Sequence, residues 1–318
     1  MADERDVLDA LPHAERIRSR KLIGGVATVI ADASGLPKME RDRLERELHD
    51  AALALPGVTE ARIAVTAAEP SRTLIAIGSG KGGVGKSTVA ANLAIAMARA
   101  GKKVGLVDAD VYGPSQPTLL GSTEKPTAED DRLIPVAAHG VKFLSLGHLV
   151  SPGHALAWRG PMATGALAKL IDADWGDAEL LIVDLPPGTG DVQLSLIQRS
   201  RPAGAVIVST PQDLSLIDAR RAVDLFNKMS VPVLGIIENM ATYECPHCGG
   251  ESHPFGTGGA EAAAAELGVP FLGRLPLSPS IREASDAGSP PAAGDTDEAR
   301  IFEAIARTLT ERLETPVH

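Results

Sequence analysis

The sequence predicts an α/β protein, in which a mostly parallel sheet has helices on both faces and a small α+β domain precedes it. Two observations carry this prediction. From residue 74 onward, short apolar runs alternate with amphipathic segments of helical period. The apolar runs are continuous, as strands buried on both faces require, whereas a half-exposed strand would alternate. Strands and helices in this order form a parallel sheet through right-handed crossovers.

The first 70 residues differ in pattern and predict the small α+β domain. The stretch 36–58 repeats apolar residues at helical spacing with charges between them. Two strands are expected beside this helix, a weak one at 25–30 and an alternating one at 59–67. A linker near residue 70 then separates this domain, residues 1–70, from a second domain, residues 71–318.

The second domain contains the expected parallel sheet. Its apolar runs predict strands at 74–78, 103–110, 179–186, 204–210, 231–238 and 270–277. The amphipathic segments predict helices at 87–100, 190–201, 214–229, 258–267 and 296–312. One further segment, 132–147, has the pattern of a hairpin and is expected to lie outside the alternation of strands and helices.

Composition limits the classes of function. The chain has 318 residues, 44% of them hydrophobic, and a formal net charge of -10 with acidic and basic residues interspersed. This balance argues against nucleic acid as a partner, because proteins bind a phosphate backbone with clustered basic residues. We find no apolar run of membrane-spanning length and no apolar core of a signal peptide, so we expect a cytoplasmic protein without a membrane partner.

A phosphate loop follows the first strand of the second domain. The string GSGKGGVGKST contains the pattern G-x-x-x-x-G-K-[ST] between an apolar run and a helical segment. Its backbone N–H groups can surround phosphate oxygens, Lys86 can neutralise the β- and γ-phosphates, and Ser87 can bind Mg²⁺. The alternative is a glycine-rich turn without a ligand. We expect ATP to contact Gly80, Lys81, Gly82, Gly83, Val84, Gly85, Lys86, Ser87 and Thr88.

Three aspartates stand at the ends of apolar runs: Asp108 and Asp110 in GLVDAD, and Asp184 in LLIVD. Phosphoryl transfer needs carboxylates that hold Mg²⁺ or its water molecules, and one that orients the attacking water. We expect Asp108 and Asp184 to serve magnesium together with Ser87. Asp110 is expected to act with Lys86 in catalysis. Taken singly, each carboxylate could instead cap a turn.

The loop carries a second lysine, Lys81. By itself, an exposed loop lysine is as often a solvated charge. The string KGGVGKST, however, resembles the deviant phosphate loop of the MinD, ParA and nitrogenase iron protein class of ATPases. This resemblance implies that Lys81 reaches across a homodimer to phosphates bound by the partner subunit and takes part in catalysis there.

The order of further motifs narrows the resemblance to the Mrp/ApbC (Nbp35-like) iron–sulfur carrier ATPases: SGKGGVGKSTVAANLA, DADVYGPSQP, WRGPM, LIVDLPPGTGDVQLSL, ENM, CPHCG and FGTGG. The match covers about residues 72–290. It implies ATP and Mg²⁺ as cofactors, slow ATP hydrolysis, and Asn239 as an adenine contact. Trp158 and Arg159 of WRGPM are expected to pack beside the nucleotide loops.

The N-terminal domain is similar to the MIP18-like domain of this family through ALPGVTEARIAVT. The acidic motif and the cysteine of that domain are absent from residues 1–70. We therefore expect a degenerate MIP18-like domain.

The cysteines of the chain, Cys245 and Cys248, form one C-x-x-C pair in YECPHCGGES. Two thiols are half of a tetrahedral metal site. If two chains meet face to face, as the resemblance at Lys81 implies, their thiolates make one symmetric four-sulfur site. Spacing leaves an iron–sulfur cluster and zinc both open. The family resemblance implies a [4Fe-4S] cluster that bridges two subunits and passes to apo iron–sulfur proteins.

Other interpretations remain open at this point. A single chain could hold structural zinc with His253 as a third ligand. The cysteines could form a thioredoxin-like redox pair, although they follow a loop and not the helix N-terminus that lowers a thiol pKa. The protein could also be a ParA/MinD-type positioning ATPase, which needs no C-x-x-C pair.

Overall fold

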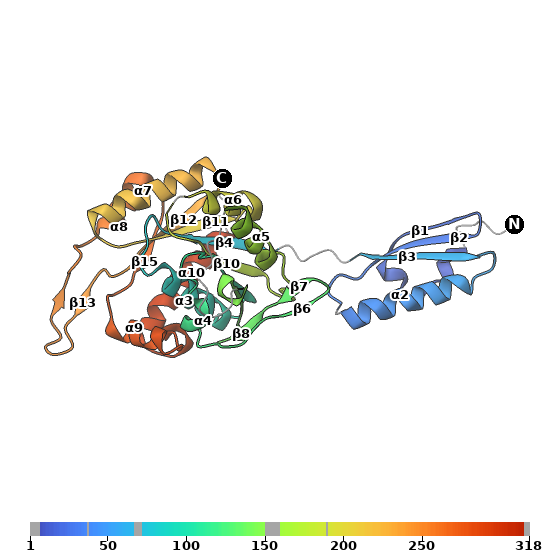
Figure 1. Ribbon diagram of the computed structural model, residues 1–318, viewed down its shortest axis with the longest axis horizontal. Coiled ribbons are helices and arrows are strands. Elements are labelled where there is room, and N and C mark those ends of the chain that lie inside the picture. The colour runs from blue at the N-terminus through green and yellow to red at the C-terminus, as the bar shows by residue number, and fades with distance from the viewer. Residues whose placement is uncertain (1–6, 37, 67–71, 150–159, 189, 315–318) are drawn as a thin grey trace. The chain divides into compact units, whose positions relative to one another are not determined.

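The chain folds into two compact units, Met1–Ser71 and Arg72–His318, and Figure 1 labels many of their helices and strands. The computed structural model describes residues 7–36, 38–66, 72–149, 160–188 and 190–314. Trp158 and Arg159, which the sequence places beside the nucleotide loops, lie outside the described residues.

The N-terminal unit is a three-stranded sheet with one long helix. The sheet order is β1-β2-β3, with β1 and β2 antiparallel and β2 and β3 parallel. Leu44 and Leu48 of the helix are buried with Ala27 and Val29 of β2 in a core that belongs to this unit. The elements are η1 (Leu8–Ala10), η2 (Ala14–Arg16), β1 (Ile17–Ile23), β2 (Val26–Asp32), α2 (Lys38–Leu53) and β3 (Glu60–Thr66).

The second unit contains a sheet of eight strands in the order β15-β12-β11-β4-β10-β5-β9-β8. Neighbours pair parallel except β8 and β9, so the parallel strands all end at one side of the sheet, here termed the carboxyl edge. The strands are β4 (Thr73–Gly78), β5 (Val104–Asp108), β8 (Val136–Ala138), β9 (Val141–Ser145), β10 (Leu180–Asp184), β11 (Gly204–Ser209), β12 (Val233–Glu238) and β15 (Phe271–Arg274).

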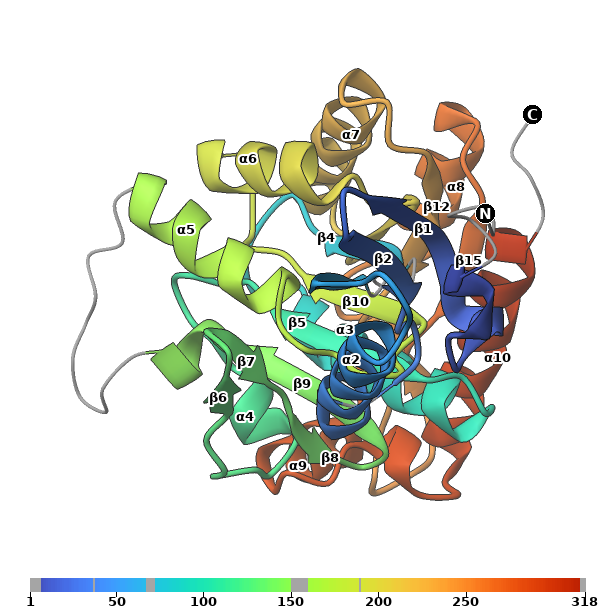
Figure 2. The ribbon, with the colours of Figure 1, turned by 90° about the vertical axis from the view of Figure 1, so that its right-hand side faces the viewer.

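Helices cover both faces of this sheet (Figure 2). On one face lie α3 (Lys86–Arg99) and α10 (Asp297–Glu314). On the other face lie α5 (Gly160–Ile171), α6 (Asp191–Ser200), α7 (Asp213–Lys228) and α8 (Gly259–Leu267).

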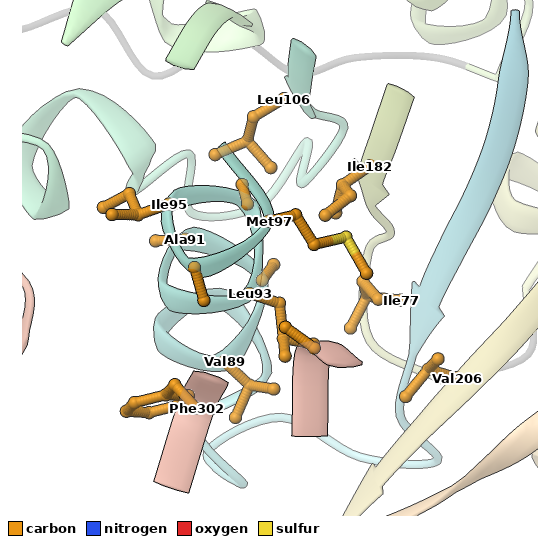
Figure 3. Packing of buried hydrophobic residues seen from close by; sticks show 14 of the residues in the cluster. Ile77, Val89, Ala91, Leu93, Ile95, Met97, Leu106, Ile182, Val206 and Phe302 are labelled. Atoms are coloured by element: carbon orange, nitrogen blue, oxygen red, sulfur yellow. The ribbon is translucent and has the colours of Figure 1, made fainter. Parts of the chain in front are cut away.

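The central strand β4 separates two hydrophobic cores. Ile75 and Ile77 belong to the core under α3 and α10, whereas Ala76 belongs to the opposite core. Figure 3 shows side chains of α3, among them Leu93 and Met97, that pack toward Ile77 and neighbouring strands. Because each strand is covered on both faces, its sequence is continuously apolar. The predicted α/β fold, with a small α+β unit before it, is confirmed.

Some elements differ from the sequence prediction. The segment 132–147 does contain an antiparallel hairpin, but its second strand, β9, joins the main sheet parallel to β5. The sequence does not predict β1, because its run IRSRKLI is mostly exposed and contains three charged residues, Arg18, Arg20 and Lys21. Helices α5 and α9 (Pro279–Asp286) are also missed. Each has a proline in its first turn, Gly165 lies inside α5, and α9 is short with few apolar residues.

The remaining short elements lie in the loops of the second unit. They are α4 (Gln116–Leu119), β6 (Thr127–Glu129), β7 (Arg132–Ile134), η3 (Leu146–Leu149), β13 (Tyr243–Glu244), β14 (Glu251–Ser252) and η4 (Pro291–Ala293). None of the helices in the described ranges is long and apolar enough to cross a membrane.

Candidate nucleotide and cysteine sites

The glycine-rich loop lies at the carboxyl edge, between the end of β4 and the start of α3. Gly85 has a φ angle of 80°, a left-handed conformation that favours glycine. Gly80 packs against α7, where a Cβ atom would lie 2.2 Å from the backbone of Asp218. These two glycines therefore fix the path of the loop. A hollow is lined by Lys81, Gly82, Gly83, Gly85, Lys86, Ser87 and Thr88, with Asp110, Ser115, Leu119 and Pro187 opposite.

Lys86 is the charged centre of this hollow. Its side chain is only 5% exposed, and its Nζ donates hydrogen bonds to Asp184 Oδ1 and, at 3.3 Å, to Ser87 Oγ. Asp110 Oδ2 lies 3.9 Å from the same nitrogen. A buried ammonium group needs such partners, because removing it from water is costly. In this structure Lys86 is paired with carboxylates, and a phosphate group would compete with them for this lysine.

Asp108 and Asp184 are cross-strand neighbours at the ends of β5 and β10, and both are fully buried. Asp108 Oδ2 accepts hydrogen bonds from Ser145 Oγ at 2.8 Å and from the backbone N–H of Gln116 at 3.0 Å. Burial, followed by the negative charge of Asp184, raises the pKa of Asp108 above its ordinary range. The two carboxyl groups thus lie side by side where the sequence predicts magnesium.

Asp110 has two roles in the local geometry. Its Oδ1 accepts hydrogen bonds from the backbone N–H groups of Tyr112 at 3.0 Å and Gly113 at 3.3 Å, so the carboxylate does cap a turn. Its other oxygen faces Lys86 in the hollow. The turn therefore holds the carboxylate in place, and one oxygen remains directed at the phosphate loop.

Gln116 is a residue of this site that the sequence reading does not single out. It is fully buried, and its Nε2 donates hydrogen bonds to Asp184 Oδ2 at 2.9 Å and to the Ser87 carbonyl at 3.0 Å. Its backbone N–H contacts Asp108. The one signal in the sequence is a long polar residue set between two prolines in GPSQP, close after the aspartates.

These groups suit a magnesium ion. Carboxylate and hydroxyl oxygens are ligand types that suit Mg²⁺. Asp108 and Asp184 are adjacent at the strand ends, and the Ser87 hydroxyl contacts the same Lys86 nitrogen as Asp184. Lys86 is the one buried cation facing these acids among the described residues. A divalent cation would offset the remaining negative charge.

Two other predicted residues make contacts within the chain. Lys81 Nζ donates to Gln212 Oε1 at 3.4 Å, so in this structure the second lysine of the loop rests on its own subunit. Asn239 follows β12, and its Nδ2 donates to the Val84 carbonyl at 2.8 Å. Asn239 also lines a second hollow, which shares Gly85, Thr88 and Leu119 with the first and continues to Pro276, Leu277 and Phe302.

The cysteine pair lies on a small hairpin that also begins at the carboxyl edge, after β12. Tyr243 pairs with Ser252 and Glu244 with Glu251, and the turn between them carries both thiols. Cys245 is half-buried and Cys248 is exposed, and neither forms a disulfide. Backbone N–H groups of His247 and Cys248 face the Cys245 sulfur and lower the pKa of its thiol. The hairpin therefore places two sulfurs at the surface, and the lowered pKa favours the thiolate form of Cys245.

One chain does not complete a metal site at this hairpin. In the ranges that the structure describes, no group of three or more histidine, cysteine, aspartate or glutamate side chains is placed to hold a metal ion. The His253 ring instead contacts the Ala241 carbonyl at 3.2 Å and Glu251 Oε1 at 3.4 Å. The single-chain zinc site through His253 is therefore not formed in this structure.

A parallel sheet whose first strand enters a G-x-x-x-x-G-K-S loop, with acidic side chains at the ends of neighbouring strands, defines a P-loop nucleotide-binding protein. The model of the ParA family, described as "NUBPL iron-transfer P-loop NTPase", matches residues 71–310. The chain belongs to this family.

Proteins named iron–sulfur cluster carrier protein are similar to the chain over most of its length. The one from Pseudomonas fragi is 46% identical over 266 residues, which are 82% of this chain and 89% of that protein. The one from Deinococcus radiodurans is 44% identical over 311 residues, 93% of this chain and 88% of that protein, so the similarity includes the N-terminal unit.

Solved structures support the fold assignment. A nucleotide-binding protein from Archaeoglobus fulgidus in complex with ADP is 38% identical, with a TM-score of 0.63 over 72% of this chain and 91% of that one. The cell division ATPase MinD of Pyrococcus furiosus is 23% identical, with a TM-score of 0.57 over 76% of this chain and 99% of that one, and shares the fold.

Proposed function

We propose that this protein is an ATP-dependent iron–sulfur cluster carrier that works as a homodimer, holds a [4Fe-4S] cluster between two subunits, and delivers it to apo-proteins. The observation that carries the proposal is the exposed C-x-x-C hairpin at the same sheet edge as the phosphate loop. The names of the relatives from Pseudomonas fragi and Deinococcus radiodurans point in the same direction.

The nucleotide would bind along the two joined hollows. Backbone N–H groups of the loop and the Lys86 ammonium group would hold the phosphates, and phosphate binding would release Lys86 from Asp184. The base would enter the second hollow, beside Asn239. Ser87, Asp108 and Asp184 would hold Mg²⁺ directly or through its water molecules, and the bound ion would neutralise charge that develops on the phosphates.

Slow hydrolysis follows from the few catalytic groups available in one chain. Asp110 Oδ2 is directed into the hollow and is the carboxylate placed to orient a water molecule. Lys81 would complete the site from the partner subunit, after leaving Gln212 of its own chain. Hydrolysis would then depend on the dimer.

The cluster is the cargo of the cycle. Cys245 and Cys248 supply two thiolates per chain, so a pair of chains would supply the four that a [4Fe-4S] cluster requires. Two observations connect the hairpin to the nucleotide site. Asn239, which precedes the hairpin in the chain, contacts the phosphate loop directly. The buried carboxylate of Glu238 accepts a hydrogen bond from the backbone N–H of Ala260 in α8, which follows the hairpin.

Cluster delivery tests this proposal. The protein should be reconstituted anaerobically, freed of excess iron and sulfide, and mixed with an apo-enzyme whose activity requires a [4Fe-4S] cluster. We expect activity to appear, and a Cys245→Ser/Cys248→Ser variant treated identically should produce none. Equal activation by the variant, or by free iron and sulfide under the same chelator, would contradict a carrier function.

A further inference from the structure

The buried amide of Gln116 connects three parts of the nucleotide site. Its backbone N–H donates to Asp108, and its side-chain Nε2 donates to both Asp184 and the Ser87 carbonyl. These partners come from the end of β5, the end of β10 and the first turn of α3. One residue therefore connects, through its backbone and its side chain, the three segments that carry the groups to which we assign magnesium.

The carbonyl oxygen of the Gln116 side chain differs from the nitrogen in its hydrogen bonding. Gln116 Oε1 is buried and has no hydrogen-bond partner among the described residues. A buried acceptor without a donor costs about 1–3 kcal/mol, and water or an ion commonly satisfies such groups. The carboxylates that Gln116 contacts, Asp108 and Asp184, only accept hydrogen bonds when they are ionised, and a water molecule can donate to Oε1. A water molecule bound to a cation is a strong donor of this kind.

A second buried glutamine provides a contrast. Gln193 of α6 is 1% exposed, and neither of its amide atoms has a partner among the described residues. It contacts none of Asp108, Asp184 and Ser87 through the hydrogen bonds that the structure contains. Both glutamines therefore bury their side-chain amide. Of the two, Gln116 is the one that forms hydrogen bonds with the aspartates at the strand ends.

We propose that Gln116 is the positioning residue for the Mg²⁺ ion: its Nε2 orients Asp184 and holds the backbone of the α3 turn that carries Ser87, and its Oε1 accepts a hydrogen bond from a water molecule in the ion's shell. The inference rests on the proposed Mg²⁺-dependent ATPase function. Mg²⁺ usually keeps several of its water molecules in such sites, so a buried acceptor at the acidic strand ends suits it. Groups that orient metal ligands in this way typically change metal affinity by about 10–100-fold.

The experiment measures Mg²⁺ binding separately from hydrolysis. Metal-free protein is mixed with a fluorescent, non-hydrolysable ATP analogue, and free Mg²⁺ is titrated while nucleotide affinity is followed. Gln116→Met should require about 10–100-fold more Mg²⁺ to reach half of the Mg²⁺-dependent change in nucleotide affinity. In EDTA, its nucleotide affinity should be within about twofold of that of the natural protein. Gln116→Asn keeps an amide that is one methylene shorter and should shift in the same direction. Gln193→Met is the matched control and should not shift the titration.

The outcomes separate this inference from the function on which it rests. Natural Mg²⁺ dependence in Gln116→Met or in Gln116→Asn would overturn it. So would equal loss of nucleotide binding with and without Mg²⁺, or an equal shift in Gln193→Met, because either result would indicate a general packing role. If the natural protein binds the analogue without any response to Mg²⁺, the Mg²⁺-dependent ATPase itself is contradicted.

Discussion

The phosphate loop and the cysteine hairpin begin at the same edge of one sheet, yet they are built in opposite ways. The groups around the loop are hydrogen-bonded, and Lys86, Asp108 and Asp184 are all buried. The hairpin has two-residue strands and exposes its thiols. A buried network positions groups for chemistry on a small ligand. An exposed pair of ligands suits cargo that must be taken up and given away.

The two regions also differ in completeness. Most groups that the nucleotide site needs come from one chain, whereas the hairpin supplies two of the four thiolates for a [4Fe-4S] cluster. We therefore expect substitutions at Lys86 and Asp110 to act on binding and turnover within each subunit, whereas Lys81 should act between subunits. Substitutions at the hairpin should act on cargo and leave the rest of the fold unchanged.

The largest effect is expected at Lys86. Lys86→Ala removes the cation of the hollow and leaves Asp184 buried without its ion-pair partner. We expect ATP turnover to fall by about 10²–10³-fold, because a preorganised charge that stabilises the transferring phosphoryl group is lost. Steady-state phosphate release measures this. Lys125→Ala, at an exposed loop lysine, is the control, and equal rates in all three proteins would contradict the assignment of the active site.

A smaller effect is expected at Asp110. Asp110→Asn keeps the size of the side chain and can still accept the turn hydrogen bonds from Tyr112 and Gly113. Nucleotide binding should persist while turnover falls by up to about a hundredfold, because an amide cannot accept a proton from water. Asp174→Asn is a matched control, since Asp174 caps a turn at Gly176 away from the loop. Comparable slowing in that control would show that the effect is only structural.

A still smaller effect is expected at Lys81. The lysine contacts Gln212 of its own chain, so its loss should leave nucleotide binding to one subunit nearly unchanged. If Lys81 reaches the partner's phosphates, Lys81→Ala should weaken ATP-dependent dimerisation by about tenfold, the value of one charge-assisted hydrogen bond. Sedimentation velocity with a non-hydrolysable analogue measures this. An unchanged dissociation constant of the dimer would contradict a contact between Lys81 and the phosphates of the partner subunit.

The smallest effect on the fold is expected at the hairpin. A Cys245→Ser/Cys248→Ser variant should have a free energy of unfolding within about 0.5 kcal/mol of the natural protein, because surface substitutions rarely cost more. Its nucleotide affinity should also be unchanged. Denaturant unfolding in the absence of metal tests this, and a loss of several kcal/mol would mean that the thiols serve the fold.

Some features of the main sheet and the nucleotide site can be predicted from the sequence, and others cannot. Continuous apolar runs identify six of the eight strands of the main sheet, because strands buried on both faces have little other composition, whereas β8 and β9 are expected from the sequence to form a hairpin outside it. The loop from Gly80 to Thr88 and the aspartates at the strand ends follow from motif and context. Gln116 does not, because its role depends on contacts with Asp108, Asp184 and Ser87 that lie far apart in the sequence. The pairing of Lys81 with Gln212 is hidden for the same reason.

The central claim is that two chains share one cluster. The most direct measurement is iron per subunit together with mass in solution, on anaerobically reconstituted protein and on the double cysteine variant. We expect about four iron atoms per two chains, cluster absorbance, and a mass twice that of the 33.0 kDa chain. The variant should hold no cluster. A monomer that retains one zinc ion per chain and shows no cluster absorbance would contradict the account.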